Sequence, residues 1–182
     1  MPWCWTTLFK PQLVKICDII IVIKIFFMNT EYINLYNNFI KLTTNKDLYK
    51  NIKKLDTFAD RLVLFLIHFA FFLKVFKNKE NTVILQKIYD FMFRQLELSI
   101  REIGYGDQSI NKKMKDYINL FHSIVSEIHF WDEMSSEKRE KKIYPFLENF
   151  DKIDHLINYF DKYYEDLRKK TLNSYIKSVI NE

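Results

Sequence analysis

The chain has 182 residues, a length that fits one folded domain with a single core. It contains only two glycines and three prolines, so the turns needed between many short strands are scarce, and long helices are favoured over a β-sandwich. The formal charge of +5 is mildly basic, which excludes a histone-like protein but is compatible with phosphate-rich partners.

The first 28 residues form an apolar N-terminal extension. Its most apolar part, residues 13–27, is interrupted by Lys15, Asp18 and Lys24, and the longest uninterrupted apolar run has five residues, Ile19 to Ile23. A spanning helix needs about 20 apolar residues, and a secretory signal needs a small-residue cleavage site that is not present here. Two interpretations remain open: a membrane-surface anchor, or a start codon assigned too early. The second is slightly favoured, with Met28 as the first residue, because a helical pattern begins just after it.

Residues 29–182 are predicted to form a single helical domain. Apolar residues recur at helical spacing from Thr30, which predicts the first helix: Tyr32, Leu35, Tyr36, Phe39 and Ile40. A polar stretch follows, with room for a short helix that carries Leu48, Ile52 and Leu55.

The most apolar segment runs from Leu62 to Leu73. It lies in a helix that Asp56 or Thr57 is expected to cap and that should end near Asn78. Its twelve residues are too few to span a bilayer, so a buried central helix is predicted. The alternative is a chaperone groove lined by phenylalanine side chains.

The next two helices are predicted to pack antiparallel around a glycine turn. The first should run from Asn81 or Thr82 to Ile103, with these residues facing inward: Ile84, Ile88, Phe91, Met92 and Ile103. Gly104 should end it, because glycine tolerates the left-handed backbone that often follows a helix. Ser109 should start the second, which carries the clearest apolar stripe: Ile110, Met114, Tyr117, Phe121, Ile124, Ile128 and Trp131.

Three further helices are predicted in the remainder. Ser135 or Ser136 opens a polar helix, which Pro145 interrupts or kinks. Two C-terminal helices follow, with inward positions at Leu156, Ile157, Phe160, Tyr163, Tyr164 and Leu167, then at Leu172, Tyr175, Ile176, Val179 and Ile180. The fold predicted is all-α, an irregular bundle of six or seven helices.

The sequence contains no recognisable catalytic or metal-binding motif, so no catalytic residue, metal or cofactor is predicted. None of the four histidines stands in a zinc-binding pattern, and His68 reads as a core histidine bonded to a backbone group or a carboxylate. Both cysteines lie in the extension, which rules out a disulfide framework in the body of the protein. The turn at Gly104 and Gly106 lacks the third glycine and the lysine of a phosphate-binding loop.

Basic residues cluster at three places: Lys41, Lys46, Lys50, Lys53 and Lys54; Lys112, Lys113 and Lys115; and Arg168, Lys169 and Lys170. Such clusters suit anionic lipid head groups or ribosomal RNA, and solvated helix faces explain them equally well. The second cluster falls in the first turns of a helix, where positive charge opposes the helix dipole, which favours a partner surface.

The stretch IREIGYGDQSINKKMK, from Ile100, resembles a helix–turn–helix block of the bacterial ubiquinol-cytochrome c chaperone family. There, Leu-Arg-Glu-hydrophobic-Gly-Val-Gly-Asp is followed by Ser-Val and basic residues. The matching positions are Arg101, Glu102, Gly104, Gly106, Asp107, Ser109, Ile110, Lys112 and Lys113. Upstream, the segment RLVLFLIHFAFFL is similar to an Arg-x-x-x-Phe-x-Leu-His-type helix of the family, through Arg61, Phe65 and His68. Downstream, the segment REKKIYPFLENFDKIDHLINYF resembles the third block of the family. The resemblance covers about residues 45–180. This chain has Phe121-His122-Ser123-Ile124 where relatives carry a Phe-Tyr-Gly-Arg-like element.

The resemblance implies a non-enzymatic, cytoplasmic chaperone, peripheral to the inner membrane, that holds newly made cytochrome b for assembly of the cytochrome bc1 complex. Mitochondrial relatives work with a small partner protein near the ribosomal exit, so the ribosome and the anionic membrane surface are further candidate partners. No DNA partner is expected, and the oligomeric state is open. The residues expected to bind partners are Arg61, His68, Arg101, Glu102, Gly104, Gly106, Asp107, Lys112, Lys113 and Lys115. The alternatives are a membrane-surface or RNA-binding helical protein of unrelated function, and an enzyme whose carboxylates no motif reveals.

Overall fold

The computed structural model describes residues 32–46, 48, 57–148, 150 and 153–180. The apolar extension over residues 1–28, and most of the short helix expected around Ile52 and Leu55, lie outside these residues.

The described residues form helices and no strand, which confirms the predicted all-α bundle. A helix over residues 32–43 is followed by α2 (Phe58–Phe76), α3 (Thr82–Glu102), α4 (Asp107–Ile128), α5 (Ser136–Ile143), α6 (Ile153–Arg168) and α7 (Leu172–Ile180). Two single 3₁₀ turns, Trp131–Glu133 and Tyr144–Phe146, flank α5. No helix among these residues is both long and apolar enough to cross a bilayer.

Helix α2 is the centre of the bundle. Thr57 caps it with a capping box: its hydroxyl accepts a hydrogen bond from the Asp60 backbone, and its own N–H donates to the Asp60 carboxylate. Every residue from Leu64 to Phe72 is buried. This confirms the predicted core helix and excludes a groove lined by these phenylalanines.

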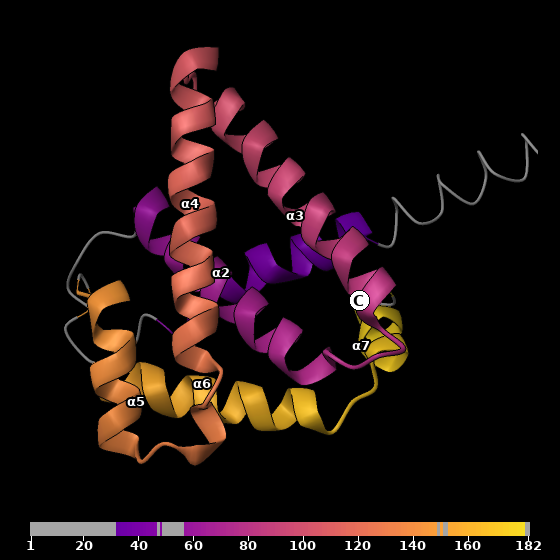
Figure 1. Cartoon of the computed structure of the whole chain (residues 1–182), viewed down its shortest axis with the longest axis vertical. Helices are drawn as coiled ribbons and strands as arrows, with labels where there is room; N and C mark the ends of the chain where they lie inside the picture. Colours follow the sequence, from indigo (N-terminus) through magenta and orange to yellow (C-terminus); the bar gives the residue numbers. More distant parts are fainter. Residues whose placement is uncertain (1–31, 47, 49–56, 149, 151–152, 181–182) are drawn as a thin grey trace, which may run out of the picture.

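Aromatic contacts show how α2 is enclosed. Phe69 meets Phe39 of the first helix at 5.7 Å between ring centroids and stacks on Phe121 of α4 at 5.2 Å. Phe71, on another side of α2, stacks on Phe160 of α6 at 5.7 Å. Figure 1 shows α2 passing behind α4, with α6 below. The core therefore lies where these helices meet around α2.

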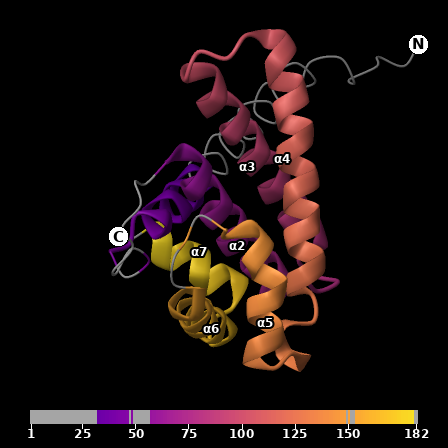
Figure 2. The ribbon, with the colours of Figure 1, turned by 90° about the vertical axis from the view of Figure 1, so that its left-hand side faces the viewer.

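Helices α3 and α4 form an antiparallel hairpin that projects from the rest of the bundle (Figures 1 and 2). Tyr89 of α3 meets Phe121 of α4 at 5.9 Å between ring centroids, which holds the hairpin together near its base. The two helices meet at the turn and separate toward their other ends, where α3 lies near α7 and α4 lies near α5 and α6 (Figure 1). The principal partner of α4 is α2 rather than α3.

Several predicted inward positions face solvent instead. Ile103 is 55% exposed because it follows the last residue of α3, at the projecting end of the hairpin. Ile40 and Ile180 are also exposed, near the ends of their helices, where fewer neighbours cover a side chain. Helix α2 ends at Phe76, two residues before the predicted end at Asn78.

Candidate functional site

The turn between α3 and α4 is closed by the side chain of Arg101. Its guanidinium donates to Glu97 one turn earlier at 2.8 Å, and it also pairs with Asp107 at the start of α4. Hydrogen bonds to Glu97 and Asp107 raise the pKa of Arg101. Arg101 therefore ties the end of one helix to the beginning of the next.

The two glycines of this turn differ in backbone conformation. Gly104 has φ +98°, a left-handed conformation that a side chain would strain, as predicted from its position after a helix. Gly106 has φ −71° and ψ 155°, which any residue adopts, and it caps α4. The prediction that Ser109 starts α4 was wrong by two residues. Its hydroxyl instead donates to the Gly106 carbonyl at 2.7 Å.

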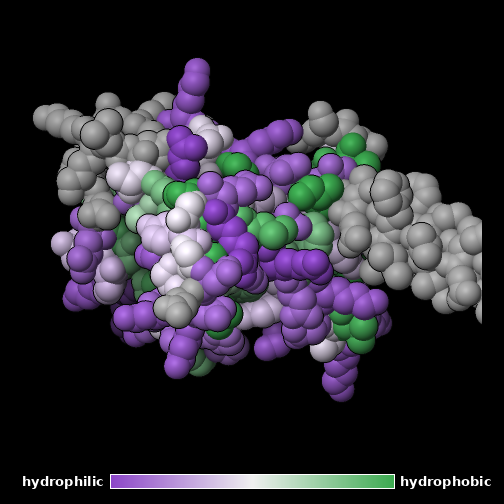
Figure 3. Space-filling model, turned by 90° about the horizontal axis from the view of Figure 1, so that it is seen from above, coloured by the Kyte–Doolittle hydropathy of each residue, from purple (hydrophilic) through white to green (hydrophobic). Residues whose placement is uncertain are grey.

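The surface of the hairpin end combines basic and apolar side chains. Lys112 and Lys115 are exposed, and neither is in an ion pair within the described part of the chain. Lys113 sits 4.4 Å from the ring centroid of Tyr105 and stabilises the turn by a cation–π contact, so part of this cluster serves the fold itself. Leu98 and Ile103 are exposed nearby. Figure 3, which looks down on this end of the molecule, shows apolar residues in small separate patches among hydrophilic ones.

Glu102 is exposed beside Arg101, and Arg61 is exposed in the first turn of α2, on a different helix from the hairpin. His68 lies in the middle of α2 and is completely buried. The structure thus groups eight of the ten predicted residues on or next to the hairpin turn, while Arg61 and His68 lie elsewhere.

His68 is a core histidine with both ring nitrogens satisfied. Nδ1 lies 2.7 Å from the carbonyl of Leu64, and Nε2 lies 3.0 Å from the hydroxyl of Tyr159. Because a carbonyl only accepts, Nδ1 carries the proton and Nε2 accepts from Tyr159. Burial lowers the pKa of His68 to about 4, against the opposing effect of the Leu64 bond, so the ring is neutral near pH 7.

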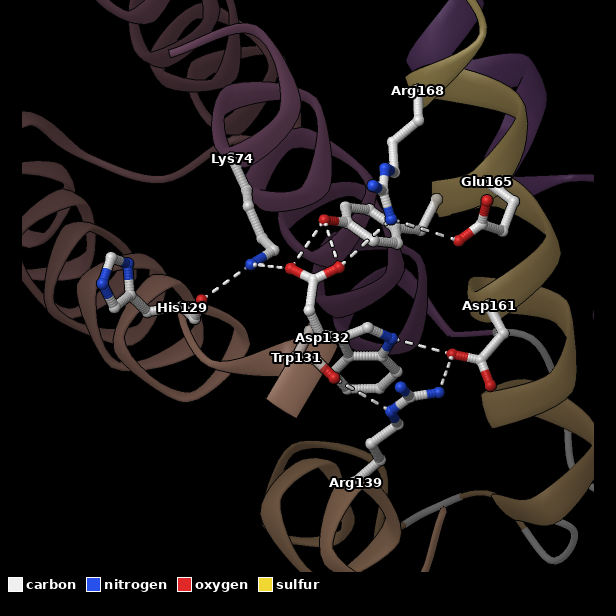
Figure 4. Close-up of polar contacts among 9 residues, drawn as sticks. Lys74, His129, Trp131, Asp132, Arg139, Asp161, Glu165 and Arg168 are labelled. Atoms are coloured by element: carbon white, nitrogen blue, oxygen red, sulfur yellow. Dashed lines mark hydrogen bonds and ion pairs between the residues drawn. The ribbon is translucent and has the colours of Figure 1, made fainter. Parts of the chain in front are cut away.

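A network of charged residues, which local spacing did not predict, joins four helical elements (Figure 4). Asp132, in the turn after α4, binds Lys74 of α2 at 2.8 Å and accepts from Tyr164 of α6 at 2.8 Å. Arg168 approaches the same carboxylate at 3.4 Å. Burial would raise the pKa of Asp132, but the hydrogen bonds from Lys74 and Tyr164 outweigh it and lower that pKa.

The second half of the network centres on Asp161 of α6. One oxygen of its carboxylate accepts from the indole N–H of Trp131 at 2.7 Å and from Arg139 of α5 at 2.9 Å. Arg139 also donates to the backbone carbonyl of Trp131 at 3.1 Å. Since each charge is matched by a partner, this network fastens α2, α5 and α6 to the turn after α4 rather than presenting a reactive group.

Two shallow grooves border α5. One, of about 530 Å³, lies between α4 and α5, and another, of about 600 Å³, lies between α5 and α6. Among the described residues, no group of three or more histidine, cysteine or acidic side chains is placed to hold a metal ion.

Comparisons with known proteins agree with the family resemblance that the sequence of the hairpin block showed. The family model of the ubiquinol-cytochrome C chaperone matches residues 51–143, just over half of the chain. The fold is similar to that in the crystal structure of the Cbp3 homolog from Brucella abortus, with a TM-score of 0.66. That similarity covers 87% of this chain and 92% of the Brucella chain at 20% sequence identity, which establishes a common fold. No significant match is found among curated protein sequences. The chain therefore belongs to the ubiquinol-cytochrome c chaperone family.

Proposed function

We propose that this protein is a non-enzymatic chaperone for assembly of the cytochrome bc1 complex and that its client is newly made cytochrome b. The observation that carries the proposal is the family match over residues 51–143, which includes α2 and the whole α3–α4 hairpin. The protein would act by binding at the cytoplasmic side of the inner membrane.

The chemistry of the client gives a physical reason for such a chaperone. Cytochrome b is a bundle of apolar helices whose polar intramembrane groups need shielding until haem and the other subunits arrive. The core phenylalanines of α2 are already used internally, so the client must be met at the surface. The hairpin end has the exposed apolar residues Leu98 and Ile103, with Lys112 and Lys115 on the following helix.

These lysines would contact either anionic lipid or ribosomal RNA, because both present dense phosphate. Converting Lys112 and Lys115 to glutamine should leave the fold intact and weaken association with anionic vesicles or with ribosomes at low salt. Lys87 and Lys177, also exposed and unpaired within the described chain, provide a matched double variant elsewhere on the surface. Equal binding by wild type and the Lys112/Lys115 variant at low ionic strength would contradict this role for the hairpin.

Gene deletion tests the function itself. Loss of the protein should lower assembled bc1 complex and b-type haem without lowering the messenger RNA of cytochrome b. Difference spectra quantify the haem, and native gels detect the complex. Normal complex levels and normal ubiquinol oxidation in the deletion strain would reject the assignment and leave a membrane-surface or RNA-binding role of unrelated function.

A further inference from the structure

The groove between α4 and α5 has an unusual combination of lining residues. Glu127 lies in the last turn of α4, Phe130 and Met134 lie in the connection that follows, and α5 supplies one wall. Figure 2 shows α5 lying beside the lower end of α4. The groove is about 530 Å³ in volume and open to solvent, which is enough for one or two side chains of a partner.

The wall from α5 carries excess positive charge. Lys138, Lys141 and Lys142 are spaced three and four residues apart, so they share one face of the helix. Lys142 pairs with Glu127 across the groove at 2.7 Å. Lys138 and Lys141 are exposed and, within the described residues, form no ion pair. The lining therefore has three cations and one anion, a net charge of +2.

The apolar part of the groove is not used by the protein's own core. Phe130 is 55% exposed, and its ring contacts the neighbouring ring of His129 at 4.7 Å between centroids. Met134 is half-buried beside it. An exposed phenylalanine next to a methionine is a typical anchor for an apolar side chain, because methionine adapts its shape to what it contacts.

We infer that this groove binds an acidic segment of a partner protein that also carries an aromatic or aliphatic side chain. The apolar side chain would lie against Phe130 and Met134, and flanking carboxylates would pair with Lys138 and Lys141. A peptide is favoured over a lipid surface because the site is concave. The inference does not depend on the identity of the chaperone's client.

Fluorescence anisotropy on the full-length protein tests this surface. The probe is a fluorescein-labelled acidic peptide in which aspartates surround a Leu-Phe pair, and two control peptides replace the aspartates by lysines or the Leu-Phe pair by serines. The acidic probe should bind at least about tenfold more tightly than either control peptide. The Lys138→Glu/Lys141→Glu variant and the Phe130→Ser variant should each weaken its binding about tenfold.

The altered residues are all exposed, so folding should be unchanged, and circular dichroism checks this for each variant. A Lys87→Glu/Lys177→Glu variant makes the same change of net charge elsewhere and should bind the probe as wild type does. Binding of the probe by the Lys138/Lys141 variant with wild-type affinity would overturn the inference. A second result would also overturn it. In that result, the wild type binds the acidic peptide no better than the two control peptides, and the two groove variants lose binding to phosphatidylglycerol vesicles.

Discussion

His68 provides a direct test of the core, because its neutral ring is required by the packing around it. A histidine with an ordinary pKa of about 6.5 in the unfolded chain and about 4 in the folded protein binds more protons when unfolded. Neutral His68 therefore does not destabilise the folded state above about pH 6.5, and the free energy of unfolding decreases as the pH falls from there toward 4. Between about pH 7.5 and pH 5 the expected loss is about 2 kcal/mol of unfolding free energy.

The effect is measured by urea denaturation followed by circular dichroism at a series of pH values. A His68→Gln variant is the control, because glutamine retains hydrogen-bonding groups but does not titrate in this range. The variant should be less stable than wild type near pH 7.5, since its fit to Leu64 and Tyr159 is poorer. Its stability should change less on acidification, and the difference between the two profiles isolates His68.

Parallel pH profiles for wild type and His68→Gln would refute this reasoning. They would mean that His68 has the same pKa in the folded and unfolded states, contrary to its burial in the centre of α2.

The turn and the charged network give two further tests by denaturant unfolding. Gly104→Ala should lower the unfolding free energy by about 1 kcal/mol because Gly104 has a positive φ, whereas Gly106→Ala should have almost no effect. Equal losses of stability in the two variants would contradict the assigned backbone conformations. Asp161→Ala should cost about 1–3 kcal/mol because the buried indole N–H of Trp131 loses its acceptor, and Glu133→Ala, at an exposed neighbouring position, should cost less than about 0.5 kcal/mol. A wild-type midpoint for Asp161→Ala would show that this bond is not needed.

Local sequence patterns were sufficient to predict the helices and to predict that α2 is the buried central helix. Helical periodicity and capping residues such as Thr57 depend only on neighbours within a few positions, so they can be read without tertiary information. The positive φ at Gly104 was predicted for the same reason.

The network around Asp132 and Asp161 could not be predicted in this way. Asp132 is 32 residues from Tyr164, and Asp161 is 22 residues from Arg139, and no spacing rule links positions on separate helices. The groove at Phe130 depends likewise on how the connection after α4 brings α5 against it. Residues at exposed helix ends, such as Ile103, were wrongly predicted to face inward. Periodicity shows which face of a helix is apolar, but it does not show how far along that face neighbouring helices bury it.

The unequal enclosure of α2 and the hairpin end implies different rates of local opening. The backbone amides of Leu64 to Phe72 are surrounded on all sides, so their exchange with solvent deuterium should require global unfolding. Residues 101–107 are all exposed, and their side chains are held across the turn by the ion pairs of Arg101 and by the cation–π contact between Tyr105 and Lys113. We therefore expect the amides of the hairpin turn to exchange faster than those of α2, through local opening that leaves the core around α2 folded.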